Sequence, residues 1–541
     1  MTFVPITIQS ATNIVECSPN AYIPPDYTTI TMPFFYPKLD KDGNYKGIEI
    51  DAVNLLELLY LLGIRYELKE GIGYFILLHS NKIASIITES EIIQLFYSFL
   101  DTYDPKNVHD KVSIKDLRNK CVNSIDKLFT KNKLVYIGRQ KESTLFNEDT
   151  AEYKYIYYQN TAVEISQKGI KIVPYSKIEK YVWQSHILQR DYSINNDNTV
   201  SQMEQFCERL SRKTVEKKDA KTLPDGSDFT QITQVLETCS ERMECLKIAL
   251  GYLLHSYTHG KLKAVVLTDS QLSESTESNG RTGKTLLAKA LSCMLAADPL
   301  CVEIGGKSFD ANDSKRYQQV RNDTQLVVIN DLKVNFDTNV LYNDITDGIK
   351  VDQKYKSVFV VFAKMLLTTN KTLRIEGESS MDRFFEYDIS NYFNSRHSPK
   401  DEFGQWFFTD WDTNEWLRFD SFMQQCVLAF FRNKKELKSL PFSNLKSRKI
   451  YDHTSIEFVQ FCEDFIQLNT WYNKSELVNQ FLEVNPDYQK KRFFTNEKFW
   501  LWLRLYTKYH EDYEEYKPKD ARMNRRTNSS YHCQFLPINL I

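Results

Sequence analysis

One short segment of the chain combines the residue types that bind phosphate. Residues 278–285 read Ser-Asn-Gly-Arg-Thr-Gly-Lys-Thr, close to the pattern GxxxxGK[ST]. In that pattern, backbone N–H groups cradle the phosphates, the lysine reaches the β- and γ-phosphates, and the final hydroxyl binds Mg²⁺. The pattern asks for glycine where this chain has Ser278, and Gly280 keeps the loop flexible. The segment predicts a nucleotide-binding loop made by Ser278, Asn279, Gly280, Arg281, Thr282, Gly283, Lys284 and Thr285.

Two later segments end in polar residues suited to hydrolysis. The apolar run 325–329 is followed by Asn330 and Asp331, where a carboxylate would hold Mg²⁺ and polarise the attacking water. Two acids are usual there, so Asp331 has the metal-linked or base role alone, or hydrolysis is weakened. The run 364–369 ends in Asn370, which is suited to orient that water. The alternative for the first run is an ordinary core strand with a polar C-terminal turn.

An arginine follows these runs. Arg383 could neutralise transition-state charge in the site of a neighbouring subunit, and the alternative is a surface arginine. The residues with predicted catalytic roles are therefore Lys284, Asn330, Asp331, Asn370 and Arg383, and Thr285 and Asp331 are the predicted metal ligands.

The elements around the loop have the order that such a site requires. Residues 263–269 are an apolar strand, residues 270–282 a polar loop, and residues 285–297 a helix rich in Leu, Ala and Lys. Strand, loop and helix in this order place the helix N-terminus at the phosphates.

Composition sets limits on the rest of the chain. Its 541 residues predict roughly three or four domains, and 42% hydrophobic residues favour packed cores. With a net charge of −2, any contact with nucleic acid must come from a local basic surface. The cysteines have no zinc-ligand spacing and indicate reduced thiols, and no segment resembles a leader or membrane span, so we expect a protein of the bacterial host cytoplasm. His255 and His259 could share a helix face as metal ligands, but Gly260 and the lack of a third ligand favour a non-metal role.

The first half of the chain carries no catalytic pattern. We expect an α+β domain over 1–105 and a mixed α/β region over 106–210, with strand candidates at 134–137 and 153–158. No paired-carboxylate strand supports a primase or polymerase site. Residues 211–262 are interpreted as a linker and helical collar, because 211–226 are charged and contain breakers and 231–257 have helical periodicity.

The order of motifs resembles a known family. A phosphate loop, an acid-ended strand, a lysine-bearing segment, Lys-x-x-x-Thr-Thr-Asn and a trailing arginine are typical of superfamily 3 helicases, the AAA+ motors of viral and plasmid replication. More narrowly, the chain resembles the helicase part of phage and plasmid primase-helicases, including those of Bacteroidota phages and mobile elements. That likeness rests on residues 334–337, 345–351, 354–356, 399–404 and 408–412.

The resemblance implies an α/β fold with a P-loop AAA+ motor over 263–432, an N-terminal α+β region and a C-terminal winged-helix-like domain. It implies ATP and Mg²⁺ as cofactors, with hydrolysis carried by Lys284, Thr285, Asp331, Asn370 and Arg383. It also implies a homo-hexameric ring around single-stranded DNA. Channel contact maps to a hairpin at Lys350, Lys354, Tyr355 and Lys356, which offer charge for phosphates and a ring for stacking. The alternative is a solvated lysine-bearing turn.

A basic linker over 433–452 precedes the C-terminal domain at 453–541. We expect helices after Thr454, over 474–482 and over 496–509, and then a basic loop. Three helices and such a loop between strands would form a winged helix that docks on duplex DNA, or alternatively on protein. The loop residues are Arg522, Arg525 and Arg526.

Together these features predict an ATP-dependent DNA helicase that translocates on single-stranded DNA in replication of a phage or mobile element, with a separate primase or polymerase as a possible partner. Two other hypotheses stay open. One is a ring-forming initiation or loading factor with weak hydrolysis, motivated by Asn330. The other is an origin-binding protein whose motor is vestigial.

Overall fold

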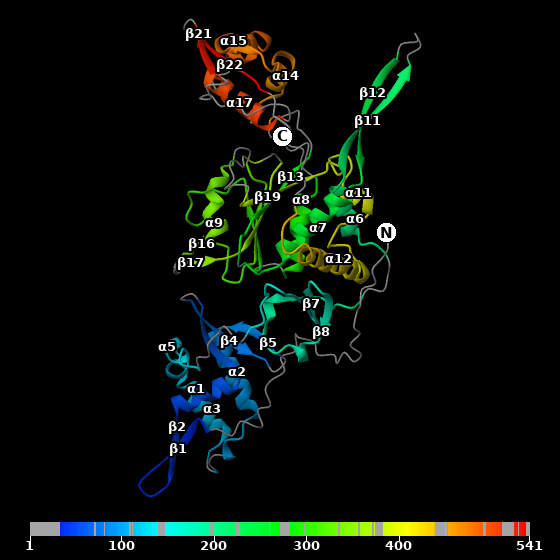
Figure 1. The fold of residues 1–541 in the computed structure, drawn as a ribbon. Coiled ribbons are helices and arrows are strands. Elements are labelled where there is room, and N and C mark those ends of the chain that lie inside the picture. The colour runs from blue at the N-terminus through cyan, green and yellow to red at the C-terminus, as the bar shows by residue number, and fades with distance from the viewer. Residues whose placement is uncertain are drawn as a thin grey trace.

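The computed structural model describes most of the chain between residues 33 and 536. The described residues are 33–69, 72–79, 82–107, 110, 112–138, 146–194, 199–222, 228–258, 260–270, 282–296, 299–333, 336–354, 358–370, 373, 382–438, 450, 453–490, 494–510, 524–527 and 530–536. Figure 1 shows the sheet that contains β13 and β19 between an N-terminal unit and a C-terminal unit.

The N-terminal unit packs helices against an antiparallel sheet. A hairpin of β1 (Phe35–Leu39) and β2 (Tyr45–Ile50) leads into α1 (Ala52–Leu61). The meander of β3 (Ile64–Lys69), β4 (Ile72–Leu78) and β5 (Ile83–Ile87) is extended by β9 (Val182–Trp183), which runs parallel to β5. The helices that follow are α2 (Glu89–Thr102), α3 (Ile114–Val122), α4 (Ile125–Leu128) and α5 (Lys131–Leu134). One apolar core runs from Phe34 to Ile137, past the domain boundary expected at residue 105.

A second small sheet connects this unit to the centre of the molecule. Its order is β10-β6-β7-β8, and it is made by β6 (Lys154–Tyr158), β7 (Ala162–Ser166), β8 (Gly169–Val173) and β10 (Ile187–Leu188). Its buried residues, among them Tyr158 and Val163, share one core with α6 (Gln202–Leu210) and the helices beside the central sheet. The packing therefore joins residues 154–210 to the centre.

The central sheet is parallel throughout. Its strands lie in the order β14-β15-β18-β13-β19. They are β13 (Ala264–Asp269), β14 (Cys301–Gly305), β15 (Leu326–Asn330), β18 (Lys364–Thr368) and β19 (Phe384–Ile389). In chain order this is 2-3-4-1-5, so β18 lies between β13 and β15. The coarse expectation of an α/β fold is confirmed, because the chain forms a mixed α/β structure with a parallel sheet.

Helices cover the sheet and fix its position. α8 (Lys284–Met294) follows β13, and α7 (Ser240–Leu254) packs along α12 (Thr413–Arg432). The two long helices approach so closely that a Cβ on Gly251 would lie 2.1 Å from the backbone oxygen of Cys426. Glycine is therefore required at that crossing. The short helix α11 (Pro399–Phe403) begins at a Ser398–Asp401 capping box.

The connection from β15 to β18 folds into its own small group. A 3₁₀ turn at Thr338–Leu341 runs into α9 (Tyr342–Thr346), and β16 (Ile349–Val351) pairs antiparallel with β17 (Phe359–Val361). Buried residues such as Leu341, Ile349 and Val361 share a core with one face of β13, β15 and β18. The hairpin is thus attached to the central sheet by apolar packing.

The C-terminal unit begins with a helix and a strand. Two further long helices follow, with a short helix between them, and the unit ends in a β-hairpin. Its helices are α14 (Ile456–Phe465), α15 (Lys474–Val484), α16 (Asp487–Lys490) and α17 (Asn496–Tyr509). The strands β20 (Trp471–Asn473), β21 (Asn524–Thr527) and β22 (Ser530–Gln534) pair in the order β20-β22-β21. Ser455, Asn473 and Thr495 cap the three longer helices through their side chains.

Three segments differ from the expectations. Residues 211–226 are expected as a linker or loop and 231–257 as helical. The helix is confirmed over residues 240–254 by α7, but β11 (Lys213–Thr222) and β12 (Asp228–Glu237) form a long antiparallel ribbon that projects from the central unit (Figure 1). Charged and polar residues dominate both strands, so the composition resembles a linker, while β-branched residues such as Val215, Thr230 and Ile232 suit strands. Residues 134–137 form the end of α5 and a turn instead of a strand.

Among the described residues, none of the helices is both long enough and apolar enough to cross a membrane.

Candidate phosphate-binding site

The start of α8 is open to an anion. Its first turn follows Gly283, whose φ of 102° lies in the left-handed region, and no side chain in the described part of the chain caps this N-terminus. The N–H groups of the first turn are therefore available to a ligand. A Cβ on Gly283 would lie 2.5 Å from the ring of Phe206, so only glycine fits this contact. Phe206 belongs to α6, and its ring stacks on Phe393.

Lys284 lies at the centre of a buried polar group. Its ammonium pairs with Asp269 at the end of β13 and lies 3.1 Å from the Thr282 hydroxyl. That hydroxyl also donates to Asp269, with 2.5 Å between the oxygens. Lys284 is 7% exposed and Asp269 3% exposed. The lysine charge is thus held by a carboxylate next to the loop.

The two polar residues at the end of β15, Asn330 and Asp331, have different hydrogen-bond partners. The Asn330 amide donates to Glu303 on β14 at 2.8 Å, and its oxygen accepts from Thr368 at 2.6 Å. Asp331 leaves the strand with a φ of 62°, and its backbone N–H donates to the Thr368 hydroxyl at 2.8 Å. Thr368 at the end of β18 therefore fixes both residues.

Asp331 turns toward Asn370 and toward the loop after β14. The Asn370 amide approaches the Asp331 carboxylate at 3.4 Å. Lys307 pairs with the other oxygen of Asp331 at 2.7 Å. The hydrogen bond and the charge of Asp331 raise the pKa of Lys307.

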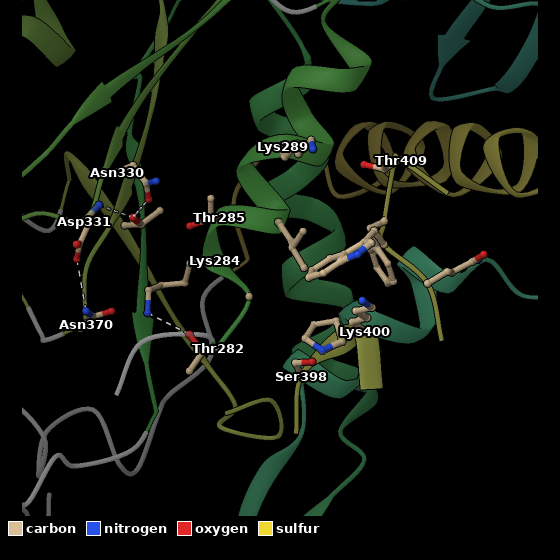
Figure 2. A pocket seen from close by; sticks show the side chains of 17 residues that line it. Thr282, Lys284, Thr285, Lys289, Asn330, Asp331, Asn370, Ser398, Lys400 and Thr409 are labelled. Atoms are coloured by element: carbon tan, nitrogen blue, oxygen red, sulfur yellow. Dashed lines mark hydrogen bonds between the residues drawn. The ribbon is translucent and has the colours of Figure 1, made fainter. Parts of the chain in front are cut away.

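One cavity of about 920 Å³ is lined by Thr282, Lys284, Asn330, Asp331, Thr368 and Asn370, among others. Figure 2 shows Lys284 and Thr285 between two groups of side chains, with Asn330, Asp331 and Asn370 on one side and Ser398, Lys400, Thr409 and Lys289 on the other. The carboxyl ends of β13, β15 and β18 meet at this edge because β18 lies between its two neighbours. Open α/β sheets bind ligands in such a crevice.

The side chains at this site suit a Mg²⁺ ion whose ligands are mostly waters and phosphate oxygens. Thr285 is exposed in the first turn of α8 and shares the cavity with Asp331. No cluster of three or more His, Cys, Asp or Glu suited to a metal occurs in the described part of the chain. Because Mg²⁺ in phosphate loops keeps waters and phosphate oxygens as ligands, one hydroxyl and one carboxylate fit that ion.

Arg383 lies at the other end of the same sheet. Its carbonyl accepts from the N–H of Ala264, the first residue of β13, at 2.8 Å. From there β13 runs five residues to Asp269, about 16 Å at the rise of a strand. The guanidinium lies over the Tyr342 ring, 5.0 Å from its centre. The structure therefore does not bring Arg383 to the cavity of its own chain.

The residues expected to contact DNA are only partly described. Lys350 on β16 and Lys354 beyond it are exposed. Arg525 and Arg526 lie on β21, within a hairpin and not in a loop as expected. Tyr355, Lys356 and Arg522 lie outside the described residues, as do Ser278, Asn279, Gly280, Arg281 and His259. His255 contacts the carbonyl of Thr150 at 2.9 Å.

Comparisons with known proteins assign no family. No family model matches the chain, and no curated protein matches it. Among solved structures, one match is a crystal structure of JCV helicase with a bound phenoxyphenyl acetamide compound, at 10% identity and a TM-score of 0.18. The match covers 38% of this chain and 64% of the JCV chain, less than two thirds of its length.

Several residues that line the cavity or pair with its lining were not predicted from the sequence. Asp269 ends a recognised strand, so its polar type was a usable signal. Lys307 and Thr368 take their roles from contacts between strands far apart in sequence, and no local pattern marks them. The segment 398–409, which forms one wall, was noted for family likeness at 399–404 and 408–412 without a role in the site.

Proposed function

We propose that this chain is an ATP-driven DNA helicase of the superfamily 3 type. The observation that carries the proposal is the placement of four groups. Lys284, Thr285, Asp331 and Asn370 line one cavity at the carboxyl ends of the parallel strands. Arg383 lies at the amino ends of the same sheet.

The strand order supports the assignment of an AAA+ motor. β18 lies between the loop-bearing strand β13 and the acid-ended strand β15. This order lets Asn370, just beyond β18, reach both the loop and Asp331. Sequence motifs that are far apart thereby form one hydrolytic site.

The position of Arg383 supports an assembly. Because Arg383 lies at the end of β13 opposite Asp269, about 16 Å along the strand, its side chain would act on the site of another subunit. A closed ring repeats that heterologous contact at every interface. We propose a homo-hexamer in which each site takes its arginine from the next subunit.

The chemistry at the site follows from the side chains. Mg²⁺, held by Thr285 and Asp331, would neutralise charge on the phosphates. Lys284 would break its ion pair with Asp269 to bind the β- and γ-phosphates. Asp331 would break its ion pair with Lys307 to bind Mg²⁺. Asn370 would then orient the attacking water, and the arginine of the next subunit would stabilise the transition state.

Two further features support action on DNA. The β16–β17 hairpin presents Lys350 and Lys354 to solvent, so in a ring these charges could grip a single strand by its phosphates. The C-terminal unit has the helix and strand order of a winged helix, and α17, its third long helix, carries an exposed Arg504. We propose that this unit docks on duplex DNA.

One observation favours a second candidate, a ring-forming loading factor with weak hydrolysis. Asn330 stands where a second acid is usual, and its amide is occupied by Glu303 and Thr368. It therefore has no charge with which to activate water, and Asp331 must act alone.

DNA-stimulated ATP hydrolysis tests the proposal. The parent chain should hydrolyse ATP faster with single-stranded DNA and open a forked duplex. Lys284→Ala should lower both activities by about 100-fold or more. Lys120→Ala, at an exposed position on α3 outside the cavity, is the control for losing a lysine from a helix.

ATP hydrolysis that DNA does not stimulate would favour the loading factor. Strand separation that survives Lys284→Ala would exclude ATP coupling through this loop.

A further inference from the structure

A tryptophan faces the cavity from the wall opposite Asp331. Trp406 lines the cavity together with Gln405 and Lys400, and it remains 57% exposed. An indole is usually among the most buried side chains on average, because it carries a large apolar area. No role proposed so far uses this ring.

The position of Trp406 is fixed by its neighbours. Its backbone N–H donates to the Asp410 carboxylate at 2.8 Å, and its carbonyl accepts from the N–H of Asp410 at 3.0 Å. The next residue, Phe407, is buried and packs on Trp411 with 5.2 Å between the ring centres. The ring is thus displayed by a tight turn whose base is anchored in the core.

A cation also lies over the ring. The Lys400 ammonium is 4.3 Å from the centre of the Trp406 indole. In Figure 2, Lys400 and Ser398 lie on the side of Lys284 away from Asp331 and Asn370. A ligand whose phosphates meet Lys284 and Asp331 would therefore extend its other end toward this wall.

We propose that Trp406 is the platform on which the nucleobase of the bound nucleoside triphosphate stacks. The inference rests on the proposed function, since it takes the phosphates to lie at Lys284. A cavity of about 920 Å³ is large enough for a whole nucleotide. Every base has a flat π-face, so an exposed, rigid indole binds it with little regard to identity. Gln405 supplies an amide beside the ring that can donate to and accept from the edge of the base.

Calorimetric titration of the full chain with two ligands tests the platform. Mg²⁺-ATP carries a base and phosphates, whereas inorganic tripolyphosphate carries the phosphates alone. Trp406→Ala should weaken ATP binding about tenfold and leave tripolyphosphate affinity within about twofold of the parent. Trp406→Phe should retain most of the ATP affinity, and GTP and CTP should follow ATP. Tyr136→Ala, which removes an exposed aromatic ring from the N-terminal unit, should change neither ligand.

Two results would overturn the platform. One is unchanged ATP affinity in Trp406→Ala. The other is an equal loss for ATP and tripolyphosphate, which would show that the ring acts through the shape of the loop. Lys284→Ala separates this inference from the proposed function, because it should weaken both ligands. If Lys284→Ala changes neither ligand while Trp406→Ala weakens ATP, the base platform stands and the phosphate assignment fails.

Discussion

The two ends of the central parallel sheet use charge in opposite ways. At the carboxyl ends, Lys284, Asp331 and Asn370 line an open cavity. At the amino ends, Lys364 starts β18 fully buried, and its ammonium donates to the carbonyls of Tyr252, at 2.6 Å, and His255. Polar residues thus line an open cavity at one end and close a helix terminus at the other.

The buried end extends into the small sheet before the central unit. Asp149 pairs with Lys154 at 2.9 Å and accepts from the Ser256 hydroxyl at 2.6 Å. Burial raises the pKa of Asp149, but Lys154, His255 and Ser256 together bring that pKa below its usual value. Burial lowers the pKa of Lys364 to about 7. Buried charges that are paired and hydrogen-bonded, as these are, hold the small sheet against the central unit.

The largest expected effect concerns Arg383, the charged residue at the amino ends of the strands to which we assign a catalytic role. Arg383→Ala should lower the ATP turnover of assembled protein by about 10³-fold while ATP affinity and ring formation persist. Measured ATPase rates, nucleotide titration and sedimentation would check this.

Mixing the Arg383→Ala and Lys284→Ala chains tests whether the site is shared. An interface that receives an intact loop from one chain and an intact arginine from the other should recover part of the turnover. Additive residual activity with no recovery would place the arginine outside the site.

The next effect is on stability. Lys364→Met should lower the free energy of unfolding by about 2–4 kcal/mol, because two buried carbonyls lose a charged donor. Thermal unfolding of the nucleotide-free protein would show it. Lys350→Met, at an exposed position on β16, is the matched control and should leave the midpoint unchanged. Equal midpoints for the two variants would show that the hydrogen bonds of Lys364 do not stabilise the fold.

A smaller effect is expected for the buried ion pair between Lys284 and Asp269 at the carboxyl ends of the strands. Asp269→Asn should strengthen Mg²⁺-ATP binding about tenfold, since Lys284 no longer has to leave a carboxylate and one negative charge is removed from an anion site. Calorimetric titration measures the change, with the exposed Asp310→Asn as the control. Weaker binding in Asp269→Asn would mean that the carboxylate positions the lysine for the ligand.

A further effect depends on pH. Burial and the charge of Lys364 lower the pKa of His255 to about 4, so the folded protein keeps this ring neutral. The unfolded chain takes up a proton below its ordinary pKa near 6.5, so stability falls as the pH drops from about 6.5 toward 4, at up to ~1.4 kcal/mol per pH unit. The unfolding midpoint of the parent should fall more steeply over this range than that of His255→Gln. Parallel curves would show that His255 does not titrate on unfolding.

The sequence predicted the elements that carry strong local signals. The apolar runs at β13, β15 and β18 stand out because a sheet covered on both faces needs continuous apolar strands. The helix at 496–509 matched α17 because Thr495 caps it and its apolar positions recur at helical spacing.

Other features have no local signal. β14 was not anticipated, since Glu303 interrupts its apolar run and is exposed. The pairs of Lys284 with Asp269 and of Asp331 with Lys307 depend on strand order and loop shape, which no motif encodes. The exposure of Trp406 likewise follows from the turn that presents it.

The contact between Gly283 and Phe206 affects how the protein can be divided. A fragment that begins at residue 263, the start expected for the motor, would contain the whole loop but lack α6 and α7. The ring that supports Gly283 would be missing, and the apolar faces of α12 that pack on α7 would meet water. Residues 154–210 share that core, so the smallest autonomous central unit should begin ahead of Lys154, and fragments cut at residue 263 should be insoluble when expressed.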